Sequence, residues 1–541
     1  MIVVVEKNYE QRTSSENISQ KDSMRRFSID RFIGSGFYHA TLLFLLAFLI
    51  RSIIAQVQII APDGVLYVKI AKDISTGHFT NVDQYGFFNL YSFLIALFQK
   101  VFQDWEFSGK MVSILFGSLS IFPLFFLAKA FFNVRVAFFS ALVYALHPRF
   151  VEISSDVLRE PTCWFFAVTA LWLAWEGLAG KRYPLFAVSA FSAGLAMVTR
   201  LEGAVVFAVI VLWISLALID GRENRKRLLI CFCVFVFSLP VLMSPFVLVL
   251  KGKLNRWELG HPVEKMSGLI VADDETERTG SDILKDMPAG YGGFMEIAER
   301  HRYTLFGAEV IYKFFKALNI VLVIFLLYGV WRRRFIDYTR KDFMIVLWLA
   351  AAFFGLYVYV MKIQYLSSRH ALFMVLPTLI WVGAGFVEIH ERLKKRYENV
   401  KFYRQYSRYD TIFLIFLAAV LLIPQTALSY RHDKTELKKA GIELKRTYLS
   451  AKYIIAQPSL NRVAFYAGME AIQLPREVDE KKLMFFFQEH RNGILLIDER
   501  TIDRYAPMVK KIITDKKFEK LPLPAVNRYE KYTFSLYRIR W

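Results

Sequence analysis

Cysteine is scarce in this sequence: three of its 541 residues are cysteines. They are Cys163, Cys231 and Cys233, and each lies in an apolar stretch. A disulfide framework or a zinc site needs cysteines in larger numbers or at ligand spacing. The sequence therefore indicates neither a disulfide-stapled scaffold nor a structural zinc site.

Several common motifs are missing as well. Residues 430–541 contain no P-loop, no GxGxxG and no HExxH motif, so no nucleotide-binding domain is expected. The first 36 residues are polar and lack the apolar segment and cleavage site of a signal peptide. Residues 1–36 are therefore predicted to form a cytoplasmic tail.

Acidic residues are in the minority, with 48 Asp and Glu against 69 Lys and Arg, a formal net charge of +21. In a soluble protein this excess would suggest nucleic acid as a partner. Here the basic residues cluster in loops between apolar runs, the pattern that sets the orientation of membrane proteins. No nucleic-acid partner is expected.

Long apolar runs are abundant, and 55% of the residues are hydrophobic, against about 45–50% in soluble domains. Many runs approach the roughly 20 apolar residues that cross a bilayer. The predicted fold is mainly α, a polytopic transmembrane helix bundle. The predicted spans are Tyr38–Ile60, Lys110–Phe131, Val134–Leu146, Pro161–Leu178, Tyr183–Val198, Gly203–Ile219, Leu228–Leu250, Val310–Val330, Phe343–Met361, Ala371–Glu388 and Thr411–Leu428.

The run Phe87–Phe102 decides the topology. It is short for a span, and if it crossed the membrane, every later basic cluster would lie outside. The positive-inside rule favours the other choice, in which it lies along the membrane as a helix over 87–103. This gives eleven spans in a cell-membrane protein, with the N-terminus cytoplasmic and the C-terminus outside. Arg51, inside the first span, is expected either to face the bundle interior or a lipid phosphate, or to snorkel.

A short helix is predicted directly after the first span, over residues 61–77. Pro62 suits the start of a helix and Gly77 suits its end. Asp63 lies in the first turn, where the helix dipole favours a carboxylate, and Tyr67 follows on the same face. This acid is either an ordinary helix-start residue or a functional group at the rim of the membrane domain.

The predicted topology gathers ionisable residues at the outer ends of the spans. Such groups are costly near hydrocarbon and usually mark a site. We expect these to meet in one cavity, although Arg200 and Glu202 would also form a simple ion pair across a turn, and Asp156 would suit a solvated loop. The residues are Asp63, Asp156, Arg159, Glu160, Arg200, Glu202, Arg369 and His370.

The chain is predicted to have three parts: the tail 1–36, a membrane domain 37–429, and a small extracytoplasmic α/β domain 430–541. The membrane domain carries an outer loop 61–86 and a long outer loop 251–309. In the last part, Arg462–Ala467, Gly493–Asp498 and Lys531–Ile539 are predicted strands; Thr435–Ile455, Asp479–His490 and Thr501–Ile513 are predicted helices. This part is expected to cover the site or bind an acceptor.

Five stretches resemble GT-C glycosyltransferases, in particular the protein O-mannosyltransferase-like group (glycosyltransferase family 39) that includes the lipid A aminoarabinose transferases. Asp63–Ala71 resembles the first outer loop of that group, and Phe87–Phe98 its juxtamembrane helix. The other three are His147–Pro161, Thr199–Gly203 and Ser368–Pro377. Many relatives carry an Asp-Glu pair where this chain has Asp63-Gly64, so neither metal binding nor acceptor type is carried over, and a divalent metal stays open.

The resemblance implies a sugar donor on a polyprenyl phosphate and an acceptor hydroxyl on a protein, lipid or glycan. A carboxylate would take the acceptor's proton in an inverting displacement, and cations would face the lipid phosphate. The predicted residues are Asp63 as catalytic base, and Tyr67, Glu160, Arg200, Glu202, Arg369 and His370 as substrate-binding residues.

Three other functions would leave different features in the sequence. A secondary transporter would show inverted repeats and helices broken around midplane charges, and no clear repeat is seen. An oligosaccharyltransferase catalytic subunit would carry a Trp-Trp-Asp sequence, which is absent. A membrane polysaccharide polymerase or ligase is the third alternative. The sequence identifies neither the sugar nor the acceptor.

Overall fold

The structure is a computed structural model of the chain. It describes residues 35–78, 89–220, 224–251, 300–332, 340–397, 410–428, 435–448, 451, 453–475, 479–491, 493–514, 517–522 and 533–540. Most of the predicted N-terminal tail, the end of the loop 61–86 and most of the loop 251–309 lie outside these residues.

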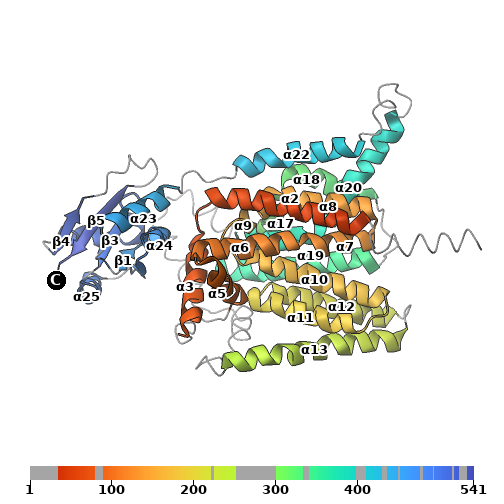
Figure 1. Cartoon of the computed structure of the whole chain (residues 1–541), viewed down its shortest axis with the longest axis horizontal. Helices are drawn as coiled ribbons and strands as arrows, with labels where there is room; N and C mark the ends of the chain where they lie inside the picture. The colour runs from red at the N-terminus through yellow and green to blue at the C-terminus, as the bar shows by residue number, and fades with distance from the viewer. Residues whose placement is uncertain are drawn as a thin grey trace, which may run out of the picture.

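A helix bundle makes up most of the described chain (Figure 1). Within it, seven helices are long and apolar enough to cross a membrane, or nine if each of two bent pairs counts as one span. The chain is therefore a multi-pass membrane protein. The individual helices of the bundle, including those too short to span a membrane alone, are α2 (Ser35–Val57), α6 (Trp105–Leu119), α7 (Ile121–Phe131), α8 (Val134–Leu146), α9 (Pro148–Ser154), α10 (Glu160–Ala179), α11 (Pro184–Thr199), α12 (Gly203–Asp220), α13 (Arg225–Lys251), α17 (Arg302–Leu318), α18 (Ile320–Arg332), α19 (Arg340–Ile363), α20 (Ser368–Tyr397) and α22 (Asp410–Leu428).

Helix α20 is the most buried of the seven candidate spans and packs against α8, α17, α18 and α19. The close approach of neighbouring helices requires small residues in α20. A Cβ on Gly383 would lie 2.2 Å from Ser140 Oγ, and one on Gly385 would lie 2.0 Å from Phe325 O. These glycines let helix backbones approach closely, as small residues do in membrane bundles. The N-terminus of α20 carries Arg369 and His370 to the end of the bundle where α3 lies.

Two short helices, α3 (Pro62–Thr76) and α5 (Leu90–Phe102), lie together at that end of the bundle (Figure 1). Helix α3 begins and ends as predicted: Pro62 is in its first turn, and Gly77 closes it at φ 78°. A left-handed glycine is a common helix end because it lacks a Cβ. Helix α5 begins at Asn89, whose side chain accepts a hydrogen bond from Tyr91 N.

The structure differs from the sequence prediction at two places in the bundle. A predicted loop contains a helix, and one predicted span consists of two helices. Residues 147–160, predicted as a loop, contain the helix α9, which Pro148 starts and which follows α8 at an angle of 58°. The predicted span Val310–Val330 is two helices, α17 and α18, bent by 101° at Asn319. Because α17 already begins at Arg302, the predicted long loop also ends earlier than residue 309.

Arg51 is fully buried inside the bundle, which confirms one of the two alternatives. Its guanidinium donates to Ala47 O at 3.3 Å, Ala145 O at 3.3 Å and Tyr144 O at 3.4 Å. A charged group inside a bundle needs such partners, because water is absent. Arg51 thus joins α2 to the end of α8.

The C-terminal part of the described chain is a five-stranded sheet with helices (Figure 1). The strand order is β2-β1-β3-β5-β4, with β2, β1 and β3 parallel and β5 antiparallel to β3 and β4. The elements are α23 (Thr435–Thr447), β1 (Tyr453–Ala456), α24 (Asn461–Ala467), β2 (Glu470–Gln473), α25 (Glu480–Glu489), β3 (Ile494–Asp498), α26 (Ile502–Tyr505), α27 (Pro507–Ile512), β4 (Phe518–Leu521) and β5 (Phe534–Ile539).

One predicted strand of this part is wrong: residues 462–467 form the helix α24. After Arg462 the run is continuously apolar and aromatic, which resembles a short buried strand. It also places Val463, Ala464 and Ala467 on one helical face, and all three are buried. Gly468, at φ 70°, then ends the helix. The end of the predicted helix 435–455 is also wrong, because Tyr453–Ala456 is the strand β1.

Candidate active site

Asp63 lies in the first turn of α3 and faces the N-terminus of α20. Its Oδ2 accepts a hydrogen bond from Nη2 of Arg369. The Asp63 side chain is 40% exposed and makes no capping hydrogen bond within α3, whose N-cap residue is Ala61. Asp63 therefore lies at the start of the helix, as predicted, but its side chain does not cap α3. It is an accessible carboxylate paired with an arginine from a distant segment.

Glu160 shares the same arginine but is buried. It lies in the first turn of α10, where Pro161 follows at a position that suits a helix start. Its Oε1 lies 3.3 Å from Arg369 Nε and 2.5 Å from Arg200 Nη1, and its side chain is 3% exposed. A buried carboxylate is tolerated when two cations flank it in this way.

Arg200 and Glu202 occupy the tight turn between α11 and α12. The guanidinium of Arg200 pairs with Glu202 through both Nη2 and Nε, the latter at 3.1 Å from Oε2. Burial opposes ionisation of Glu202, but Arg200 outweighs it and lowers the pKa of Glu202 to about 2. Burial likewise opposes the charge of Arg200, but Glu160 and Glu202 outweigh it and raise its pKa well above the usual value.

Five of the predicted residues thus form one ion-pair network, which runs Asp63–Arg369–Glu160–Arg200–Glu202. The structure brings them together from four parts of the chain: α3, α20, α10 and the turn after α11. The network holds three carboxylates and two guanidinium groups. It therefore leaves one negative charge in excess, and its exposed end is Asp63.

Tyr67 and His370 flank the network without joining it. Tyr67 is 4% exposed, one turn after Asp63, and its ring packs edge-on against Tyr91. The Arg159 guanidinium carbon lies 5.5 Å from the centre of the Tyr67 ring. Burial raises the pKa of Tyr67 to about 12, so its hydroxyl stays protonated at neutral pH. His370 lies beside Arg369 on α20, with its ring 5.3 Å from that of Tyr359.

Asp156 is buried, so its interpretation as a solvated loop residue is wrong. Its Oδ1 accepts hydrogen bonds from Ala61 N at 2.9 Å and Val157 N at 2.7 Å. Burial raises the pKa of Asp156 to about 6, although Lys110 and the two backbone donors oppose this. Asp156 is therefore a structural partner of the chain segment that starts α3.

Sequence reasoning missed Tyr466, which reaches this segment from the C-terminal part. The Tyr466 hydroxyl accepts a hydrogen bond from Ile60 N at 2.9 Å and donates one to Glu106 Oε1 at 3.0 Å. Lys438 of α23 lies 3.8 Å from the same glutamate, and Lys69 of α3 lies 3.5 Å from Glu470. A tyrosine within an ordinary amphipathic helix gives no local signal of such a distant contact.

Close packing explains why glycine, and not a larger residue, follows Asp63. A Cβ at position 64 would lie 2.7 Å from Val157 O, a backbone atom, and 2.9 Å from the Ile60 side chain. The glutamate that many relatives carry here would therefore not fit this packing. Among the described residues, no group of three or more His, Cys, Asp or Glu side chains is placed to hold a metal ion.

Comparisons with known proteins find a family match over one segment of the chain and similar folds over most of it. Residues 89–247 match the family described as dolichyl-phosphate-mannose-protein mannosyltransferase. The archaeal oligosaccharyltransferase AglB from Archaeoglobus fulgidus, solved with an inhibitory peptide and a dolichol-phosphate, has a similar fold. The TM-score is 0.56 at 13% identity, over 93% of this chain and 74% of that one.

A second solved structure, ArnT from Cupriavidus metallidurans bound to undecaprenyl phosphate, gives a TM-score of 0.54 at 13% identity. The match covers 93% of this chain and 98% of that one. No curated protein matches the sequence significantly.

The chain therefore shares its fold with these two solved membrane proteins, AglB and ArnT. It is similar to the dolichyl-phosphate-mannose-protein mannosyltransferases over residues 89–247 and to ArnT over most of its length. The resemblance drawn from the sequence motifs is confirmed at this level.

Proposed function

We propose that this protein transfers a sugar from a polyprenyl-phosphate donor to an acceptor hydroxyl, with Asp63 as the general base of an inverting displacement. One observation carries the proposal: an exposed carboxylate on α3 is paired with an arginine that is itself partly exposed. The reaction needs a base for the acceptor and a cation for the leaving phosphate, and the pair offers both at one place.

The pairing also suggests how the base becomes available. A carboxylate oxygen that already accepts a hydrogen bond from a guanidinium is not open to an acceptor hydroxyl. Arginine binds phosphate through a two-pronged set of donors. When a donor phosphate draws the Arg369 guanidinium away from Asp63, the carboxylate oxygen is freed to accept the proton of the acceptor hydroxyl. Glu160, buried and fixed by Arg200, keeps the other side of Arg369 in place.

The remaining residues take supporting roles in this proposal. Arg200 is held by two carboxylates, so it acts through Glu160 rather than on the phosphate. Tyr67 and His370 shape the walls around Asp63 and Arg369. The topology that fits is eleven spans in the cell membrane, with residues 1–36 cytoplasmic. The site and residues 430–541 then lie outside, and the latter border the acceptor.

The alternatives are less well supported. A secondary transporter would place its charges midway along broken helices, whereas the Asp63 network lies at helix termini and in a turn. A membrane polysaccharide polymerase or ligase would use the same kind of donor. The acceptor alone separates it from the proposed activity.

The test is sugar transfer in proteoliposomes from a panel of radiolabelled polyprenyl-phosphate sugars. General-base catalysis contributes about 10²–10⁴-fold, so D63N should lose that factor in kcat while donor binding persists. Asp73 lies on the same helix outside the network, so D73N is the matched control and should keep wild-type turnover. Equal turnover by D63N and wild type would exclude Asp63 as the base. A protein that neither binds nor consumes any of these donors would exclude the proposed function.

A further inference from the structure

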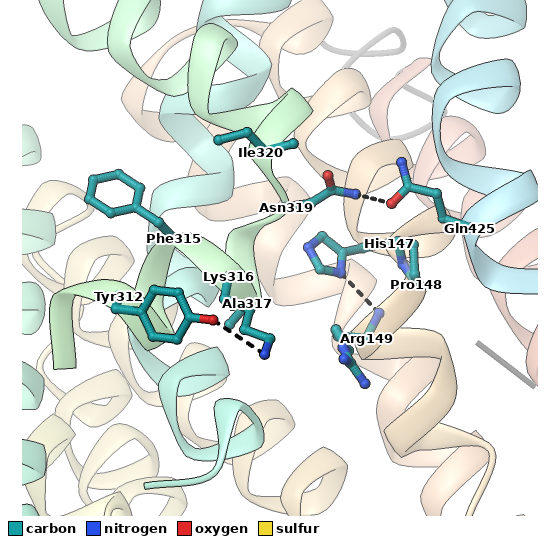
Figure 2. Close-up of a pocket in the computed structure, with 10 residues that line it drawn as sticks. All are labelled: His147, Pro148, Arg149, Tyr312, Phe315, Lys316, Ala317, Asn319, Ile320 and Gln425. Carbon is teal, nitrogen blue, oxygen red and sulfur yellow. Dashed lines mark hydrogen bonds between the residues drawn. The ribbon is translucent and has the colours of Figure 1, made fainter. Parts of the chain in front are cut away.

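A cavity of about 650 Å³ lies where the two bent helix pairs meet, away from the Asp63 network. It is bounded by the start of α9, the end of α17, the start of α18 and Gln425 of α22 (Figure 2). None of the five network residues lines it. It therefore needs an explanation other than the proposed transfer reaction.

The backbone around this cavity is firmly held. His147, which joins α8 to α9, donates from Nε2 to Leu318 O at 3.1 Å and accepts from Arg149 N through Nδ1 at 3.2 Å. Asn319 has φ 79°, an uncommon conformation for a residue with a Cβ, and its side chain donates to Gln425 Oε1 at 2.6 Å. Conformations of this kind persist only where the surroundings enforce them. The cavity is thus a built feature of the fold.

Two cations line the cavity, and no carboxylate does. Figure 2 shows Arg149 reaching it from α9 and Lys316 from α17. Arg149 is paired with Glu152 at 2.7 Å, yet its side chain remains 37% exposed. Lys316 Nζ lies 3.5 Å from the Tyr312 hydroxyl, an uncharged partner. The local charge therefore favours an anionic ligand.

Part of the remaining wall is apolar and continues onto an exposed apolar surface of α18. Phe315, Ala317 and Ile320 line the cavity. Ile320 and Ile324 of α18 are 74% and 65% exposed, so they form an apolar surface beside the opening. A free inorganic anion would leave these walls unused, whereas a lipid can place its phosphate at the cations and its hydrocarbon chain along α17 and α18. Basic pockets between membrane helices bind lipid headgroups in this way.

We propose that this cavity binds the phosphate headgroup of an anionic membrane lipid, with Arg149 and Lys316 as the phosphate ligands and the apolar surface of α18 against the chain. The site is separate from the Asp63 network and does not depend on the proposed transfer reaction.

The experiment measures lipid binding to the full-length protein in a neutral detergent by native mass spectrometry. The probes are phosphatidylglycerol, zwitterionic phosphatidylcholine and inorganic phosphate. Removing a cation from a lipid-phosphate site lowers affinity about fivefold. R149Q and K316Q should therefore each lose about fivefold in affinity for phosphatidylglycerol, and the double variant about twenty-five-fold.

The matched control is K313Q, which removes a lysine from the same helix. Lys313 is paired with Glu309 at 3.0 Å and does not line the cavity, so this variant should bind anionic lipid like wild type. K316Q disturbs only a contact to Tyr312, so it tests the proposal even if R149Q fails to fold. Wild-type affinity of K316Q for phosphatidylglycerol would overturn the proposal. So would inorganic phosphate or phosphatidylcholine binding as tightly as phosphatidylglycerol.

Discussion

The first turns of α3 and α10 offer the same arginine a carboxylate in two different settings. Asp63 on α3 is 40% exposed and has one arginine, whereas Glu160 on α10 is 3% exposed and lies between two. The buried carboxylate has no room for a substrate and fixes the arginine. The exposed carboxylate can exchange its partner. In the proposed reaction, the same helix position therefore provides support in one case and the reacting group in the other.

The contacts that hold the first turns of α3 and α10 in place also differ. Glu160 is held by side chains of the membrane bundle alone. The segment before Asp63 is held by Asp156 from the bundle and by Tyr466 from the C-terminal part. The position of the exposed carboxylate thus depends on contacts between two parts of the chain, which variants can separate.

Replacing Glu160 should have the largest effect on stability. Breaking a buried ion pair costs about 3–5 kcal/mol, because the remaining charge stays buried without its counter-charge. E160Q should therefore lower the thermal stability of the detergent-solubilised protein strongly, whereas D63N should leave it close to wild type. Melting curves of the two variants test this. Equal melting temperatures would contradict the division between a supporting and a reacting carboxylate.

The Asp156 carboxyl should give the fold a distinctive pH dependence. Its pKa is raised from an ordinary 3.8 to about 6, so the folded protein binds this proton more tightly than the unfolded chain does. The carboxyl therefore stabilises the fold most below about pH 4, and this contribution is lost as the pH rises through about 6. At about 1.4 kcal/mol per pKa unit, the loss is at most about 3 kcal/mol.

D156N provides the reference for this measurement, because an amide oxygen still accepts the two backbone hydrogen bonds and does not titrate. The melting temperature of the wild type should fall relative to that of D156N between pH 4 and pH 6, and the difference should stay constant above. A difference that does not change across this range would show that Asp156 does not titrate there.

Sequence reasoning predicted the local features of this site and the residues that meet there, but not which of them form ion pairs. Pro62, Gly77 and Asp63 identify α3 because each residue acts on its own helix end. The pairing of Asp63 with Arg369 joins residues 306 positions apart, and no local pattern encodes such a contact. The prediction that Asp63 and Arg369 lie near each other rested on membrane topology. Topology places both residues at one end of the bundle but does not show which residues pair.

The errors have a similar origin. Residues 462–467 fit both a strand and a helix pattern, and packing against α23 decided for the helix. The bend at Asn319 interrupts an apolar run whose hydropathy is continuous, so only tertiary contacts such as the hydrogen bond to Gln425 show why the helix breaks there. The steric reason for Gly64 was equally invisible, because Val157, which occupies the space beside it, is 93 residues away in the sequence.

The smallest effect is expected from Tyr466. Y466F removes one hydroxyl that links Ile60 N to Glu106, and a single hydrogen bond contributes about 0.5–1.5 kcal/mol. Since this bond positions the start of α3 rather than the donor, kcat should fall about three- to tenfold while the KM for the donor stays unchanged. Tyr448 donates to Pro522 O at 2.8 Å within the C-terminal part, so Y448F is the matched control and should leave both constants unchanged. If Y466F and Y448F behave alike, Tyr466 does not position Asp63, and the C-terminal part contributes nothing to the exposed carboxylate through this contact.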